Sequence, residues 1–267
     1  MWVACILLLA SCNKAGTGGN RKPQTLQKDT IVYLSSDRTG PSCEIHITYT
    51  YLESESETDS VTPVINRTIL AAGYGGKYGS CTPDEFVSRF SEGLIKDYRE
   101  DVEDLYKAEA KRGTVDFPSW YSYKFDFQTS MSMGADGVWN YVISSYLYTG
   151  GAHDNTLYTC LNVDSATGRL ITVWDVFRKE CESDICALIL EELIEEANVS
   201  IEGASVSSLK DLQEYGILLN TDLYVPSNFI LERDEVTFVY NQYDIAPYAA
   251  GAFELSIPVR ELADYMQ

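Results

Sequence analysis

Alternating apolar and polar side chains identify a strand early in the chain. Between residues 43 and 53, Ile45, Ile47 and Tyr49 alternate with polar residues. A period of two is typical of a strand with one face in a core and the other in water. The same reasoning predicts strands at residues 29–35 and 61–70, the latter as a hairpin partner of the 43–53 strand.

The strongest helix signal follows a glycine-rich tract. Thr82 is suited to cap a helix, Pro83 to occupy its first position, and Glu85 to complete a capping box. Gly113 then marks the end of a helix of about 28 residues, long enough to cross a whole sheet. Apolar residues recur along it at intervals of three or four: Phe86, Phe90, Leu94, Tyr98, Val102 and Leu105.

The remaining pattern mixes strands and helices without a regular βαβ order. Strands are predicted at 120–130, 138–148, 153–164, 229–232, 235–240 and 252–259. Helices are predicted at 183–197, to which the run 170–177 leads, and at 207–215, with a last turn at 260–266. Such a series favours an α+β class, with antiparallel sheets and helices packed on one face. We expect two subdomains of related size, at residues 29–147 and 148–267.

The first residues are typical of an export signal. Residues 1–11 are mostly apolar and too few to span a bilayer, and Leu9-Ala10-Ser11-Cys12 resembles the lipobox of bacterial lipoproteins. We predict a lipoprotein signal peptide, lipidation of Cys12 and a flexible tether over residues 12–28. The basic start of such signals is missing, and an ordinary secretory signal is the alternative. Asn13 favours an outer-membrane address and leaves the leaflet open.

The charge of the chain restricts its partners. Forty Asp and Glu residues stand against 20 Lys and Arg, a formal net charge of −20. Such a surface repels nucleic acid and attracts basic proteins. The alternative interpretation is that the charge only maintains solubility.

Neither the cysteines nor the histidines form a recognisable catalytic or metal-binding motif. Five cysteines follow Cys12, an odd number for an oxidising compartment; Cys181 and Cys186 are close enough in sequence to bridge. His46 reads as a solvated strand residue. The glycine tract at residues 73–80 lacks the Ser or Thr of a phosphate loop. No catalytic residue, metal or cofactor is therefore predicted.

Two loops contain the candidate binding residues. Gly150 and Gly151 permit an unusual turn before His153 and Asp154. Tyr243 and Tyr248 lie in an irregular segment where tyrosine rings are suited to recognition. The alternatives are that these tyrosine rings cover the core, and that His153 serves a catalytic site.

Three motifs occur in an order that resembles a known family. They are Thr149-Gly150-Gly151-Ala152-His153, the run from Asp164 to Leu170 with Trp174-Asp175-Val176-Phe177, and the segment from Tyr243 to Gly251. Over residues 145–262 the chain resembles the extracytoplasmic domain of RsiV-type anti-sigma factors and PdaC-type peptidoglycan deacetylases. The resemblance implies an α+β fold and work at the cell envelope, because RsiV-type members sense lysozyme by binding it. No transmembrane helix, sigma-binding segment or deacetylase domain accompanies it.

These observations lead to three functional hypotheses. The first is an envelope lipoprotein that binds a basic protein such as lysozyme, or a cell-wall component. The second is an enzyme that acts on peptidoglycan or glycans through the His153 loop. The third is a structural lipoprotein of the envelope.

Overall fold

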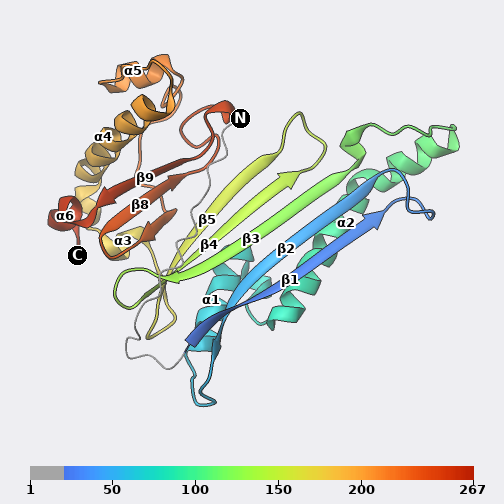
Figure 1. Ribbon diagram of the computed structural model, residues 1–267, viewed down its shortest axis with the longest axis horizontal. Helices are drawn as coiled ribbons and strands as arrows, with labels where there is room; N and C mark the ends of the chain where they lie inside the picture. The colour runs from blue at the N-terminus through green and yellow to red at the C-terminus, as the bar shows by residue number, and fades with distance from the viewer. Residues whose placement is uncertain (1–20) are drawn as a thin grey trace.

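The computed structural model describes residues 21–267 and has two layered parts (Figure 1). The predicted signal peptide and Cys12 lie outside the described residues. No helix within residues 21–267 has the length and apolar character needed to cross a membrane. The predicted tether needs correction: residues 21–28 form the first half of a strand, because they pair with the strand at 47–54.

The larger part is built on a six-stranded sheet in the order β1-β2-β3-β4-β5-β6. All neighbours are antiparallel except β2 and β3, which run parallel because two helices connect them. This parallel pair is an exception to the predicted antiparallel pattern. The strands are β1 (Arg21–Tyr33), β2 (Ser42–Ser54), β3 (Tyr123–Met133), β4 (Val138–Tyr148), β5 (Asn155–Asp164) and β6 (Leu170–Ile171).

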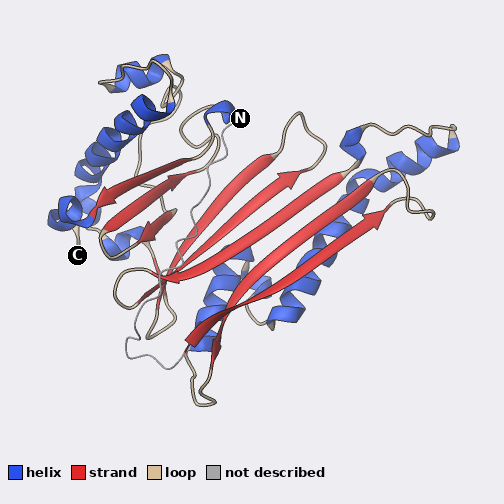
Figure 2. Cartoon of the chain, in the orientation of Figure 1, coloured by secondary structure: helices blue, strands red, loops and turns tan. Residues whose placement is uncertain are grey.

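Two helices, α1 (Thr62–Tyr74) and α2 (Pro83–Lys111), cover one face of this sheet (Figure 2). The predicted capping box of α2 is confirmed, with Thr82 and Glu85 each bonded to the other's backbone N–H. The strand predicted at 61–70 is wrong, because these residues form α1. Their buried side chains, Ile65 and Ile69, are four residues apart and share one helical face.

The smaller part is a three-stranded antiparallel sheet in the order β7-β8-β9, against which α4 packs. Its strands are β7 (Phe229–Leu231), β8 (Glu235–Tyr240) and β9 (Phe253–Pro258). Its helices are α3 (Val173–Val176), α4 (Glu182–Ser200), α5 (Leu209–Glu214) and α6 (Val259–Leu262). The two parts together confirm the α+β class.

Each part has its own hydrophobic core. Among the described residues, the first core extends to Leu170 and the second begins at Val173. β5 belongs to the first sheet through its pairing with β4. The sheet therefore continues past residue 147, where the sequence pattern placed the division, and the cores change between β6 and α3.

Two segments differ from the bounds that the sequence pattern suggests. The run at 120–130 begins with a turn of 3₁₀ helix at Ser119–Tyr121, and β3 starts only at Tyr123. The run at 170–177 divides into β6 and α3. Thr172 and Asp175 explain the second division, because they form a capping box that starts a helix.

Candidate functional site

The seam between the two parts runs along the outer edge of β5. Side-chain carbonyl oxygens accept hydrogen bonds from backbone N–H groups of β5: Gln242 from Thr156 (3.0 Å), Asn241 from Tyr158 (2.7 Å) and Asn228 from Cys160 (2.7 Å). These three side-chain amides therefore supply hydrogen-bond acceptors to β5 backbone N–H groups along an edge where β6 pairs only with Asn162 and Val163. This arrangement holds the loops of the smaller part against the start of β5.

The two predicted binding loops meet at this seam. The rings of His153 and Tyr248 stack with centroids 3.7 Å apart, and the Tyr243 hydroxyl lies 3.1 Å from Nε2 of His153. The other ring nitrogen of His153, Nδ1, lies 2.8 Å from the carbonyl oxygen of Asp154. We call His153, Tyr243 and Tyr248 the aromatic cluster. These residues are separated by about 90 positions in the sequence and come together only in the fold.

Gly150 and Gly151 have different environments. Gly150 has a φ of +84°, and a Cβ added there would lie 2.4 Å from the carbonyl oxygen of Trp120. Gly151 has no such contact: an added Cβ would lie 3.6 Å from the nearest backbone atom. Gly150 therefore positions the loop against Trp120, whose proximity sequence reasoning missed.

Tyr243 has an unfavourable backbone conformation. Its φ of +71° lies in the left-handed region, where residues other than Gly and Asn are uncommon. A turn maintains it: the Asn241 N–H donates to the Asp244 carboxylate (2.7 Å), and the Asp244 N–H donates to the Asn241 carbonyl (3.0 Å). The ring is 58% exposed. The strained residue thus presents most of its side chain to solvent.

Two further residues extend the site beside the cluster. Burial raises the pKa of Tyr146, and the nearby charges of Asp154 and Tyr248 raise it further. Tyr146 lies on the face of the six-stranded sheet away from the helices, in register with Asp126 and Thr156. Sequence reasoning placed Asp154 at the site but not Tyr146.

Segments that build the site lack basic residues. No Lys or Arg occurs in residues 125–168 or 234–259, although each range contains several carboxylates. Strand pairing places Lys124 opposite Tyr148, just outside the first segment. This distribution is visible in the sequence and indicates an acidic surface around the aromatic cluster.

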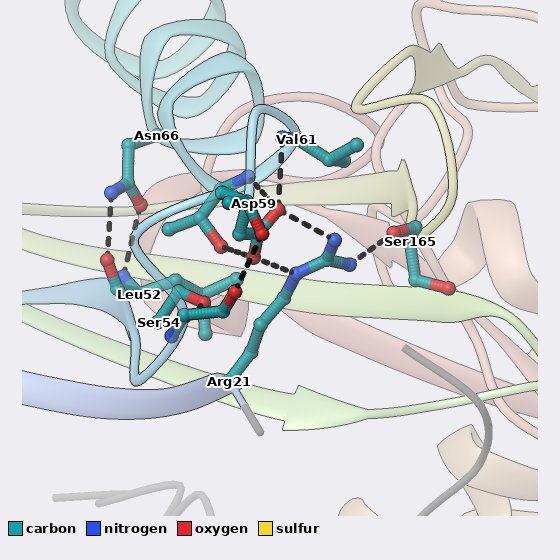
Figure 3. Close-up of polar contacts among 10 residues, drawn as sticks. Arg21, Leu52, Ser54, Asp59, Val61, Asn66 and Ser165 are labelled. Atoms are coloured by element: carbon teal, nitrogen blue, oxygen red, sulfur yellow. Dashed lines mark hydrogen bonds and ion pairs between the residues drawn. The ribbon is translucent and has the colours of Figure 1, made fainter. Parts of the chain in front are cut away.

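A second polar cluster lies at the other end of β5 (Figure 3). The Arg21 guanidinium donates to both carboxylate oxygens of Asp59, at 2.7 and 2.9 Å, and to the carbonyl oxygen of Ser165 at 2.5 Å. Asp59 also accepts from the N–H of Val61 and the hydroxyl of Thr62, at the start of α1. Arg21 holds the pKa of Asp59 well below its usual range. Both side chains are largely buried, with 10% of the Arg21 and 6% of the Asp59 side-chain surface exposed.

The five cysteines of residues 21–267 are free thiols, including Cys181 and Cys186. The bridge considered between those two is therefore not formed. Burial raises the pKa of the Cys43 and Cys160 thiols to about 12. These two are protonated at neutral pH and unsuited to act as nucleophiles.

The fold and site define a class: a two-core α+β protein with an acidic, aromatic surface where its parts meet. Residues 174–260 match the family model described as "Protein of unknown function (DUF3298)". They include the Trp174–Phe177 and Tyr243–Gly251 motifs, but not the Thr149–His153 motif. No curated protein matches the chain.

Solved structures of DUF3298 proteins resemble the whole chain. A member of that family from Bacteroides fragilis NCTC 9343 is 27% identical, with a TM-score of 0.83 over 93% of this chain and 94% of that one. A DUF3298 family protein from Pseudomonas aeruginosa PAO1 is 18% identical, with a TM-score of 0.56 over 92% and 94%. The second likeness concerns the fold alone.

Proposed function

We propose that this chain is an envelope lipoprotein, anchored through Cys12, whose aromatic cluster binds a basic protein such as lysozyme. The observation that carries the proposal is the meeting of His153, Tyr243 and Tyr248 on segments without Lys or Arg. Exposed aromatic rings are frequent binding hot spots, and an acidic surround accelerates association with a cationic partner. The resemblance to RsiV-type domains supports the same class of partner.

The surroundings of His153 favour binding over catalysis. Its Nδ1 faces a backbone carbonyl and its Nε2 faces a phenol. A histidine that acts as a general base is ordinarily oriented by a carboxylate and bonded to a nucleophile or water. We therefore favour a contact role for His153 over an enzyme that acts on peptidoglycan.

Calorimetry with lysozyme at low and high salt tests the proposal. Wild-type protein should bind at low salt and weaken as the salt concentration rises, because the attraction is electrostatic. Tyr248→Ala should lower affinity by roughly 10- to 100-fold, the effect of removing a binding hot spot. Tyr33→Ala, on β1 at the opposite edge of the six-stranded sheet from β5, is the matched control and should bind like wild type.

Two further measurements separate the alternatives. Absence of binding at low salt removes lysozyme as the partner, and binding of uncharged cell-wall fragments in a parallel titration would favour the cell-wall alternative. Mass spectrometry of the native protein tests the anchor. A polypeptide without fatty acid that still begins at Met1 would contradict the envelope location.

A further inference from the structure

A second exposed apolar region adjoins the aromatic cluster. Leu209 at the start of α5 is 43% exposed and Leu219 is 58% exposed. They border a cavity of about 350 Å³, whose other lining residues are Gln213, Leu218, Asn220, Thr221, Asp222 and Leu223. Single exposed leucines are ordinary, but a group around a cavity is typical of an interaction surface.

Backbone contacts join this leucine pocket to the Tyr243–Tyr248 loop. The Leu218 N–H donates to the Ile245 carbonyl at 2.7 Å. A Cβ added to Gly216 would lie 3.6 Å from the ring of Pro247, the residue before Tyr248. Tyr215, 47% exposed, precedes that glycine. The segment of the pocket and the loop of the aromatic cluster are thus joined by a backbone hydrogen bond and a packing contact.

The charges in and beside the segment that lines the leucine pocket are mainly acidic: Asp211, Glu214 and Asp222 against Lys210. Residues 211–232 contain no Lys or Arg, and they include Asp211, Glu214, Asp222 and Glu232. Lys210 directly precedes this range. A cationic partner is therefore attracted to the pocket as it is to the aromatic cluster, and an anionic lipid or polymer is repelled.

We propose that the leucine pocket, through its exposed residues Leu209 and Leu219, is a second contact region for the same cationic protein. An apolar side chain of that protein, flanked by Lys or Arg, packs on Leu209 and Leu219 at the border of the pocket, while another part of the protein covers the aromatic rings. This inference rests on the proposed function and extends it, because it predicts a two-point interface of standard size in place of one loop.

Binding of lysozyme to five purified variants, including Tyr248→Ala alone, tests the inference. Leu209→Ser/Leu219→Ser should weaken binding about tenfold. Tyr248→Ala combined with it should weaken binding by the product of the separate factors, because side chains that do not contact each other or a shared residue contribute additively to the free energy. Leu219→Arg should slow association, since it opposes a cationic partner. Val199→Ser is the control: it is 82% exposed, at the end of α4, and should leave binding unchanged.

The outcomes distinguish this inference from the proposed function. Wild-type affinity in Leu209→Ser/Leu219→Ser, with loss in Tyr248→Ala, overturns the second contact and leaves the first. An equal loss in Val199→Ser overturns it too, because the leucines would then have no specific role. A wild-type protein that does not bind lysozyme removes both for that partner. Circular dichroism of each variant checks that its fold is retained.

Discussion

The two ends of β5 carry polar clusters that differ in burial and in how completely their groups are satisfied. At the Asp164 end, Arg21 and Asp59 are buried and bonded to each other in two places. At the Asn155 end, His153 and Tyr243 are exposed, Tyr248 is half-buried, and Tyr243 has a positive φ. A strand of 10 residues separates them by roughly 30 Å.

The difference indicates which cluster serves stability and which serves recognition. The Arg21 network has little exposed surface left for a partner. Removal of either Arg21 or Asp59 would leave the other charge without its counter-ion. The aromatic cluster retains most of its Tyr243 surface and tolerates an unfavourable backbone angle. Strain maintained at an exposed site is frequent in functional regions.

The largest expected effect comes from breaking the buried pair. Asp59→Ala should lower the free energy of unfolding by about 4 kcal/mol, because it strands Arg21 and removes the bonds to the start of α1. Urea denaturation measures it. Asp136→Ala, which breaks an exposed pair with Arg233, should cost less than about 0.5 kcal/mol. Equal losses in the two variants would contradict a structural role for the Arg21 network.

The second prediction concerns the glycine that positions the 150s loop. Gly150→Ala should cost about 3 kcal/mol, because alanine resists a φ of +84° and its methyl group would clash with the Trp120 carbonyl. Gly151→Ala should be nearly neutral in thermal denaturation. If both substitutions are neutral, Gly150 does not fix the loop against Trp120.

Local elements were predictable because their signals lie within a few residues. The capping box of α2 and the alternation in β2 specify their structures without distant contacts. The structure of segment 61–70 was not predictable in this way, because the positions of its isoleucines are compatible with a strand and with a helix. The helix is favoured by Asp59, whose carboxylate accepts from the first backbone N–H groups, and by Asn66, which bonds to Leu52 of β2. The Asn66 contact depends on the fold, whereas the Asp59 contacts are local.

The candidate site was predictable in its loops but not in its assembly. The glycines before His153 and the tyrosines of the 240s are visible as unusual local composition. Their meeting depends on amides such as Asn228 and Asn241, which bond to the β5 backbone. An asparagine that satisfies a strand edge has no sequence signature of its own. The role of Trp120 has no sequence signature either, because the residue that it contacts, Gly150, is distant in the sequence.

A smaller effect is expected in the pH dependence of stability. Arg21 lowers the pKa of Asp59 in the folded protein, whereas an unfolded aspartate has a pKa of about 3.9. The stabilisation is therefore complete above that value and is lost as the pH falls below it. Between pH 6 and pH 3, wild type should lose about 1 kcal/mol more than Asp59→Asn, which has no such carboxylate. Urea denaturation at both pH values measures the difference; parallel losses would contradict the shift.

The smallest predicted effect separates recognition from stability at the exposed end of β5. Tyr243→Asn should raise the free energy of unfolding by about 0.5 kcal/mol, because asparagine adopts a positive φ more readily than tyrosine and little buried area is lost. The same variant should weaken lysozyme binding, since it removes an exposed ring. Tyr243→Phe keeps both the ring and the strain, and should change stability little. Thermal denaturation and calorimetry on the two variants measure both quantities, and a Tyr243→Asn protein that is less stable but binds normally would show that the ring serves the fold. A gain in stability together with a loss of binding is what a side chain retained for its partner would produce.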